Sequence, residues 1–145
     1  ESGAGGVVRA GAGLARLGLE GLPLHPIPTD VLIPAPTQGT LALEVRAGGV
    51  AEPFVAALDH PATARAATAE RLGVAAFGAD CTLPLAAWAR EEDGWLHLVG
   101  LLATPDGRHT ARGAAAGSDP ESVAAACVEA MRREGADEVL RRIRG

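Results

Sequence analysis

The chain contains no lysine, tyrosine or asparagine, and Gln38 is its only glutamine. All 13 basic residues are therefore arginines, and the 18 acidic residues leave a formal net charge of −5. An acidic balance is unlike that of proteins that bind nucleic acid by neutralising its phosphates, so no nucleic-acid partner is expected. No apolar run reaches the roughly 18 residues that a membrane-spanning helix requires, and no membrane partner is expected either.

Cysteine and aromatic residues are also scarce. The two cysteines, Cys81 and Cys127, have a separation that fits neither a metal-ligand motif nor a disulfide framework, so we predict no metal site and a reduced, cytoplasmic compartment. With 48% hydrophobic residues the chain is not disordered, and two Phe and two Trp leave the core to Ala, Leu and Val. The scarcity of Asn, Gln and Cys suits a heat-adapted protein of a thermophile, and a GC-rich genome would give the same bias; both explanations stay open.

Proline and periodicity divide the first half of the chain. Residues 21–37 contain five prolines and are predicted to be an extended connector. Residues 40–46 alternate apolar and polar side chains, which is typical of a strand. No strand-like neighbour occurs before residue 83, so the partner sheet of this lone strand is expected outside these 145 residues. Helices are predicted for residues 51–58 and 61–76, and we interpret Glu70 and Arg71 as a structural ion pair.

The second half has the pattern of an α+β domain. Residues 83–90, 95–104 and 108–114 are predicted to be three strands that tight turns join into an antiparallel meander. Ser118-Asp119-Pro120-Glu121 has the cap, the first-turn proline and the acid of a helix start, and Gly135 is predicted to end that helix before a last one at 137–144. The fold class is therefore α+β, a three-stranded antiparallel sheet with helices packed on it. The predicted buried face of the first of these helices comprises Val123, Ala126, Cys127, Ala130 and Met131.

Three places are candidates for contact with a ligand, and each has a plain structural alternative. Cys81 lies in a predicted loop, where its thiolate is a potential nucleophile, or it is a small buried residue without a role. Gln38-Gly39 offers an amide beside a backbone that a ligand approaches closely, or it is a simple bend. Arg16 binds a carboxylate or is a solvated arginine. Cys127 is predicted to be a core residue, and no motif identifies a catalytic residue, which stays unknown.

The order and spacing of several motifs are more specific than any single residue. In chain order they are Ala12-Gly13-Leu14-x-Arg16-Leu17, Pro34-Ala35-Pro36-x-Gln38-Gly39-x-Leu41-Ala42-Leu43-Glu44-x-Arg46, His60-x-x-Thr63, Ala69-Glu70-Arg71, Cys81 with Pro84 after it, Leu98 to Gly107, and Gly135 to Leu140. Together they resemble the hydroxymethylbilane synthase (porphobilinogen deaminase) family, and the resemblance spans nearly the whole chain.

This resemblance implies a transferase of porphyrin and heme biosynthesis. Members of the family join four porphobilinogen units head to tail into a linear tetrapyrrole and release ammonia at each step. Growth occurs on a dipyrromethane primer that a cysteine holds as a thioether, and Cys81 matches that cysteine. Arg16 matches an arginine that receives pyrrole carboxylates, and Gln38-Gly39 matches a hinge segment that lines the cofactor cleft. The implied cofactor is thus a dipyrromethane bound covalently to Cys81, and the implied substrate is porphobilinogen.

The resemblance also implies a domain organisation. Residues 1–37 correspond to the tail of a second, periplasmic-binding-protein-like α/β domain, and residues 38–57 to a hinge and a strand that return to the first domain. Residues 58–145 correspond to a C-terminal α+β domain that anchors the cofactor. The chain begins without Met and matches the C-terminal half of the family, so we expect the catalytic aspartate in an N-terminal half that is this chain's partner. Alone, the fragment is expected to be inactive.

Some positions depart from the family pattern. The family has Gly-Gly where this chain has Ala79-Asp80, Gly where it has Thr37, and Ala where it has Thr40. A diverged, non-catalytic module that binds a partner chain is therefore the alternative hypothesis. An unrelated α+β domain with a redox thiol is a third.

Overall fold

The computed structural model describes residues 5–19, 21–78 and 83–145. The chain divides into two compact units, the residues up to Leu32 and the residues Ile33–Gly145. The first unit contains α1 (Gly11–Arg16), which has no side-chain cap and buries no residue. Residues 21–32 of this unit form neither helix nor strand, as predicted for the proline-rich connector. No described helix in either unit is long and apolar enough to cross a membrane.

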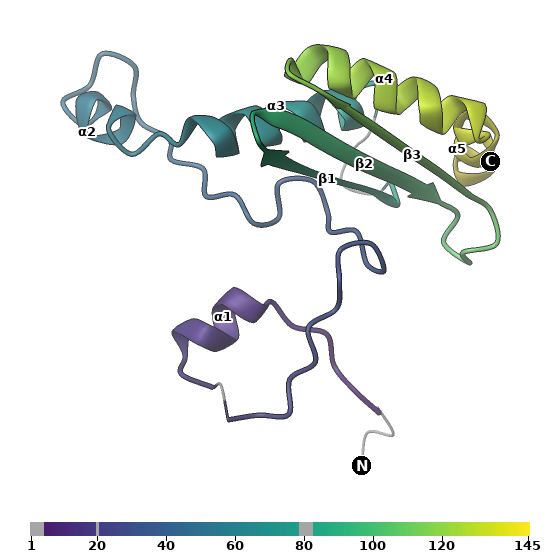
Figure 1. Ribbon diagram of the computed structural model, residues 1–145, viewed down its shortest axis with the longest axis horizontal. Helices are drawn as coiled ribbons and strands as arrows, with labels where there is room; N and C mark the ends of the chain where they lie inside the picture. The colour runs from purple at the N-terminus through teal and green to yellow at the C-terminus, as the bar shows by residue number, and fades with distance from the viewer. Residues whose placement is uncertain (1–4, 20, 79–82) are drawn as a thin grey trace. The chain divides into compact units, whose positions relative to one another are not determined.

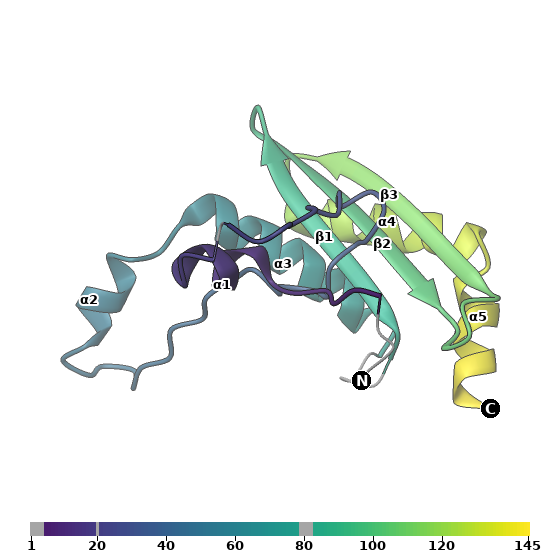
Figure 2. The same cartoon turned by 90° about the horizontal axis from the view of Figure 1, so that it is seen from below.

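The second unit contains an α+β domain, as the sequence predicts. Its sheet has the strand order β1-β2-β3, and both neighbouring pairs are antiparallel. Helices α3 and α4 pack on one face of this sheet and against each other (Figure 1 and Figure 2). The elements are α2 (Glu52–Ala56), α3 (Pro61–Ala75), β1 (Leu85–Glu92), β2 (Trp95–Ala103), β3 (Thr110–Gly117), α4 (Pro120–Arg133) and α5 (Ala136–Arg144).

Side chains alternate along the strands, so one face of the sheet packs on the helices. Every second residue of β2, among them Leu96, Leu98 and Leu102, is buried toward the core. Asp93 and Gly94 join β1 to β2 with φ values of 51° and 78°, and two positive φ values are what a type I′ hairpin turn requires. The largest fully buried side chains come from β2 and α4: Leu96, Leu98, Leu102, Val123 and Cys127.

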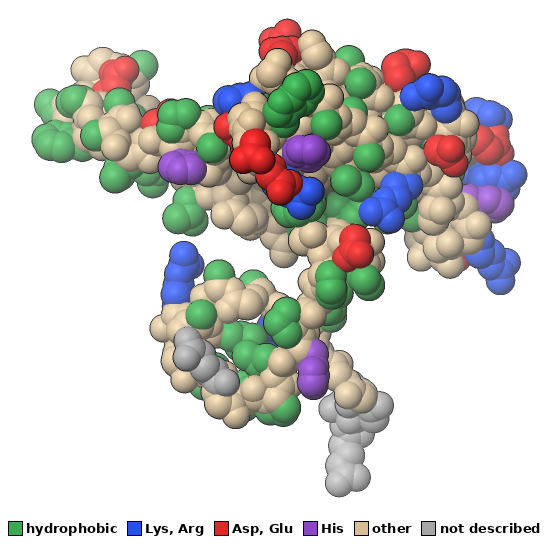
Figure 3. All heavy atoms as spheres, in the orientation of Figure 1, with side chains coloured by type: hydrophobic (Ala, Val, Ile, Leu, Met, Phe, Trp, Pro, Cys, Tyr) green, Lys and Arg blue, Asp and Glu red, His purple; other side chains and the backbone are tan. Residues whose placement is uncertain are grey.

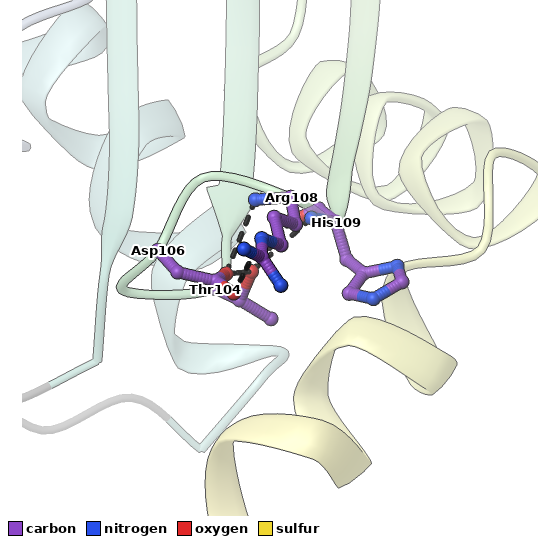
Figure 4. Close-up of polar contacts among 4 residues, drawn as sticks. All are labelled: Thr104, Asp106, Arg108 and His109. Atoms are coloured by element: carbon purple, nitrogen blue, oxygen red, sulfur yellow. Dashed lines mark hydrogen bonds and ion pairs between the residues drawn. The ribbon is translucent and has the colours of Figure 1, made fainter.

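A network of hydrogen bonds closes the turn between β2 and β3 (Figure 4). The Thr104 hydroxyl donates to Oδ1 of Asp106 at 2.6 Å, and the N–H of Arg108 donates to the same oxygen at 3.1 Å. The N–H of His109 donates to Oγ1 of Thr104 at 3.1 Å. These bonds satisfy the buried threonine and hold the turn that brings β3 back alongside β2.

Helix α4 packs closely on the sheet because glycines face it. A Cβ placed on Gly113 would lie 2.6 Å from the carbonyl oxygen of Cys127 and 2.7 Å from the backbone nitrogen of Met131. A Cβ placed on Gly100 would lie 2.6 Å from Sδ of Met131. The absence of side chains at these two positions therefore sets the distance between α4 and the sheet.

The buried face of α4 is only partly the predicted one. Val123, Cys127 and Met131 are buried as predicted, but Ala126 is exposed and Ala130 is half-buried. The buried side chains of α4 are instead those at positions 123, 124, 127, 128 and 131. A helix that lies on a sheet contacts it through pairs of adjacent residues that recur one turn apart.

The strand predicted for residues 40–46 stays a prediction, because its partner sheet is expected outside these 145 residues. These residues form no strand in the described structure, and Leu41 and Leu43 are 81% and 57% exposed. Their alternating pattern is that of a strand, but a strand exists only when a neighbour supplies hydrogen bonds, and the described residues offer none. The helix predicted for 51–58 is the shorter α2, whereas the helix predicted for 61–76 is confirmed as α3.

We predict that Gly113→Ala lowers the free energy of unfolding by about 2–3 kcal/mol, because the added methyl group would overlap backbone atoms of α4. Urea denaturation followed by far-ultraviolet circular dichroism measures the change.

Gly73→Ala is the matched control. A Cβ on Gly73, within α3, would meet only Cδ2 of Leu98 at 3.8 Å, beside an apolar cavity of about 10 Å³. Alanine favours a helix more than glycine does, so this variant is expected to gain about 1 kcal/mol. Equal effects of the two substitutions would contradict the close packing of α4.

The β2–β3 turn generates a pH-dependent prediction. Hydrogen bonds from the Thr104 hydroxyl and from the Arg108 N–H hold the pKa of Asp106 below its ordinary value of 3.8. Because this pKa is lower in the folded state, ionised Asp106 stabilises the fold above the unfolded-state pKa, and the contribution disappears as pH falls through the folded-state pKa. We therefore expect Asp106→Ala to melt below the wild type at pH 7 and the gap in melting temperature to narrow as the pH falls below about 4. A constant gap in melting temperature over that range would contradict this role.

Candidate functional site

Residues 34–39 form a turn, called the Gln38 turn below, that carries two of the predicted cofactor-binding residues. The N–H of Gln38 donates to the carbonyl of Ala35 at 3.2 Å, and Oε1 of Gln38 accepts from the N–H of Ala35 at 3.2 Å. The turn is thus closed both by its backbone and by the side chain of Gln38. Gln38 and Gly39 are exposed at its end.

A buried glutamate holds the Gln38 turn against the domain. Glu70 of α3 is 6% exposed; its Oε2 accepts from the N–H of Thr37 at 2.6 Å and its Oε1 from the N–H of Ala89 at 2.6 Å. Both bonds are short because the acceptor is charged. Among the described residues Glu70 forms no ion pair, and the predicted pairing with Arg71 is wrong. Adjacent helical residues point in different directions, and Arg71 is exposed.

The same contacts cover the free edge of the sheet. β1 pairs with β2 on one side only. On the other side, the N–H of Ala87 donates to the carbonyl of Pro34 at 3.3 Å, and the next outward N–H, that of Ala89, donates to Glu70. An uncovered edge strand offers its backbone groups to any other strand, so the Gln38 turn and Glu70 together protect β1.

Thr37 has a left-handed backbone, with φ of 57°. For a residue with a side chain this conformation costs about 1–2 kcal/mol, and a β-branched residue is poorly suited to it. The hydrogen bond from the Thr37 N–H to Glu70 therefore holds a conformation that threonine does not favour by itself.

An arginine of the last helix holds the far end of α3. Nη2 of Arg144 in α5 donates to the carbonyl of Phe77 at 2.9 Å. Phe77 is 4% exposed, and its carbonyl lies just beyond α3, where backbone carbonyls lack helical partners. This contact connects α3 and α5 near residue 78, the last described residue before position 79.

The predicted cofactor-binding residues belong to three segments of the chain. Arg16 is exposed in the last turn of α1 in the first unit. Gln38 and Gly39 are neighbours on the Gln38 turn of the second unit, and apart from the chain neighbours of Gly39 no atom of the described residues lies within 4 Å of the position of a Gly39 Cβ. Cys81 lies outside the described residues. Guanidinium and amide N–H groups are donors that suit carboxylates, so the residue types fit a cofactor that carries carboxylates.

Cys127 is a core residue, as the sequence predicts. It is 2% exposed, and burial raises the pKa of its thiol to about 11. A protonated thiol without access to solvent is not a nucleophile, so Cys127 is unsuited to hold a cofactor. The described residues also contain no group of three or more His, Cys, Asp or Glu side chains placed to bind a metal ion.

The hydrogen bonds of Glu70 to distant backbone groups were not predicted, although the sequence contains a signal for a buried carboxylate at this position. Ala66, Ala69 and Gly73 face the core at helical spacing, and Glu70 lies on the same face of α3. A carboxylate on a buried face among small residues needs a dedicated partner. The pattern does not reveal the partners, because the two N–H groups are 33 and 19 residues away in the sequence.

Exposed apolar side chains gather around α2. Val50, Phe54 and Leu58 are 92%, 74% and 69% exposed, and Figure 3 shows hydrophobic side chains over this end of the second unit. α2 packs against no other described helix or strand. Residues 40–46 also expose apolar side chains, among them Leu41 and Leu43, which the described residues leave uncovered.

Two family models match the chain. Residues 64–134 match the model described as porphobilinogen deaminase, C-terminal domain. Residues 1–51 match the model described as porphobilinogen deaminase, dipyromethane cofactor binding domain. These matches define the class as that of proteins with a dipyrromethane cofactor, and the Gln38 turn lies within the segment that matches the cofactor-binding model.

Curated relatives agree with the family models. The chain is 41% identical over 142 residues to the porphobilinogen deaminase of Moorella thermoacetica, and the aligned region covers 95% of this chain and 45% of that protein. It is 40% identical to the enzyme of Thermus thermophilus and 34% identical to that of Carboxydothermus hydrogenoformans, covering 48% and 46% of those proteins. The chain belongs to the porphobilinogen deaminase family, which is a family of transferases, and it spans about half the length of these relatives.

We predict that Cys127 resists alkylation in the folded protein. With a pKa of about 11, only about one thiol in a thousand is ionised at pH 8, and burial blocks access as well. In a Cys81→Ala variant, iodoacetamide should therefore add no mass until the protein is unfolded in urea. Rapid labelling of the folded variant would contradict the core assignment of Cys127.

Proposed function

We propose that this chain is the C-terminal portion of a hydroxymethylbilane synthase, which joins four porphobilinogen units into a linear tetrapyrrole with release of ammonia. The observation that carries the proposal is the paired family match, in which residues 1–51 resemble the cofactor-binding domain and residues 64–134 the C-terminal domain of one enzyme family. The relatives of similar coverage support the same assignment, because all three carry the name porphobilinogen deaminase.

Cys81 is proposed to anchor the dipyrromethane. Its Sγ bonds to the methylene carbon of an aminomethyl pyrrole; the carbon–nitrogen bond breaks, and ammonia leaves with the thiol proton. The burial of Cys127 supports this choice, because it removes the other thiol of the chain from consideration. When bound, the cofactor supplies the terminal pyrrole to which porphobilinogen is added.

Arg16, Gln38 and Gly39 are proposed to bind and orient the carboxylates of the cofactor. The guanidinium of Arg16 has the planar pair of donors that matches a carboxylate. Oε1 of Gln38 is directed to the Ala35 N–H, so the NH₂ group is the part of the amide that Gln38 presents to a ligand. Open space at the Cα of Gly39 lets a ligand approach the backbone.

The partner of this chain is proposed to be the N-terminal half of the same enzyme, in the cytoplasm. The relatives are about twice as long as the chain, and the exposed apolar surface of residues 40–58 is suited to contact further protein. The catalytic residues are expected in that other half, and this chain alone is proposed to lack turnover.

An anchor on Cys81 predicts a specific covalent mass. The intact mass of the full-length enzyme should exceed the sequence mass by one dipyrromethane, because a thioether survives denaturation in formic acid. Cys81→Ala should abolish both this added mass and tetrapyrrole formation from porphobilinogen.

Cys127→Ala is the matched control, since it also removes one thiol. It should keep the added mass and lose only stability, by about 1–2 kcal/mol for a small buried side chain. An adduct that persists in Cys81→Ala would overturn the anchor, and a full-length protein without any adduct would favour a non-catalytic module.

A further inference from the structure

We propose that Glu70 is a positioning residue of the enzyme, which fixes the Gln38 turn to the C-terminal domain so that the cofactor-contacting side of the turn keeps one orientation. The inference rests on the proposed function for its consequence in turnover. The structural part of the inference, called the clamp below, is the pair of hydrogen bonds that the buried Glu70 carboxylate accepts from Thr37 and Ala89.

The geometry distinguishes this contact from an ordinary surface interaction. Each oxygen of Glu70 accepts one backbone N–H at 2.6 Å, one from the Gln38 turn and one from β1. Glu70 is 6% exposed, so its carboxylate oxygens depend on these donors rather than on water for hydrogen bonds. Removal of either segment would leave a buried oxygen without its bond, and the two segments are thus held together.

The two joined segments are those that bear the proposed site. Gln38 and Gly39 directly follow Thr37, whose N–H is one of the donors. Ala89 belongs to β1, which begins at Leu85, four residues after Cys81 in the sequence. Glu70 therefore connects the proposed carboxylate-binding turn to the strand that follows the proposed anchor.

The backbone of Thr37 makes the turn dependent on this clamp. Thr37 has φ of 57°, a conformation that L-residues avoid and that glycine adopts freely. With threonine here, the Gln38 turn would relax toward other conformations if the bond to Glu70 were lost. A glycine at position 37 should therefore make the turn less dependent on Glu70.

Hydrogen exchange measures the clamp in the full-length enzyme. In the wild type, the Thr37 and Ala89 amides should exchange at least about 100-fold more slowly than the exposed Gly39 amide. Glu70→Gln replaces one acceptor by a donor, so at least one of the two amides should lose about tenfold of that protection. Wild-type amides that exchange as fast as Gly39 would overturn the proposal even if the variant failed to fold.

Turnover measures the consequence of the clamp. In Glu70→Gln, kcat for porphobilinogen should fall about tenfold at a temperature where the variant is folded, while KM changes by less than about twofold and the cofactor mass is retained. Glu91→Gln is the matched control: it removes the charge of an exposed carboxylate on β1 that pairs with Arg65, and kcat should stay unchanged. Adding Thr37→Gly to Glu70→Gln should restore part of kcat, which a loss of stability alone would not allow.

The outcomes separate the two proposals. Unchanged kcat together with lost amide protection would overturn the positioning role and leave the proposed function standing. A wild-type enzyme that holds no cofactor and consumes no porphobilinogen would overturn the proposed function and, with it, the positioning role. The exchange of the Thr37 and Ala89 amides would then decide the structural clamp on its own.

Discussion

The outer edge of β1 is the constraint on which the arrangement of the second unit depends. A three-stranded sheet has two edges, and its backbone N–H groups must find acceptors or water. Here the Pro34 carbonyl and the Glu70 carboxylate supply acceptors to Ala87 and Ala89. Because one of these acceptors is a side chain on α3, hydrogen bonds join the Gln38 turn to the sheet and to the helix, which also pack on each other through the apolar core.

The secondary structure of the C-terminal domain could be predicted because its signals are local. The Asp93-Gly94 turn, the Asp119 cap with Pro120 after it and the alternating pattern of β2 each act over a few residues. The strand predicted for residues 40–46 depends instead on a distant partner. Its pattern describes the surface that the segment offers, but only a partner that the described residues lack could turn it into a strand.

The residue types of the candidate site could be proposed from the sequence, but the contacts that hold the Gln38 turn could not. The exclusion of Cys127 followed from its place on the apolar face of a helix, and its burial agrees. Glu70 was assigned a local partner, Arg71, because adjacent charges in a sequence suggest an ion pair. Its true partners are backbone N–H groups that every residue possesses, so no side-chain pattern marks them, and only the fold brings them within reach.

Rigid elements on both sides of a short segment are a common way to present a reactive group. Arg144 holds the carbonyl of Phe77 before residues 79–82, and Glu70 holds β1 after them. Both contacts pair a charged side chain with backbone, so they tolerate changes in the neighbouring side chains.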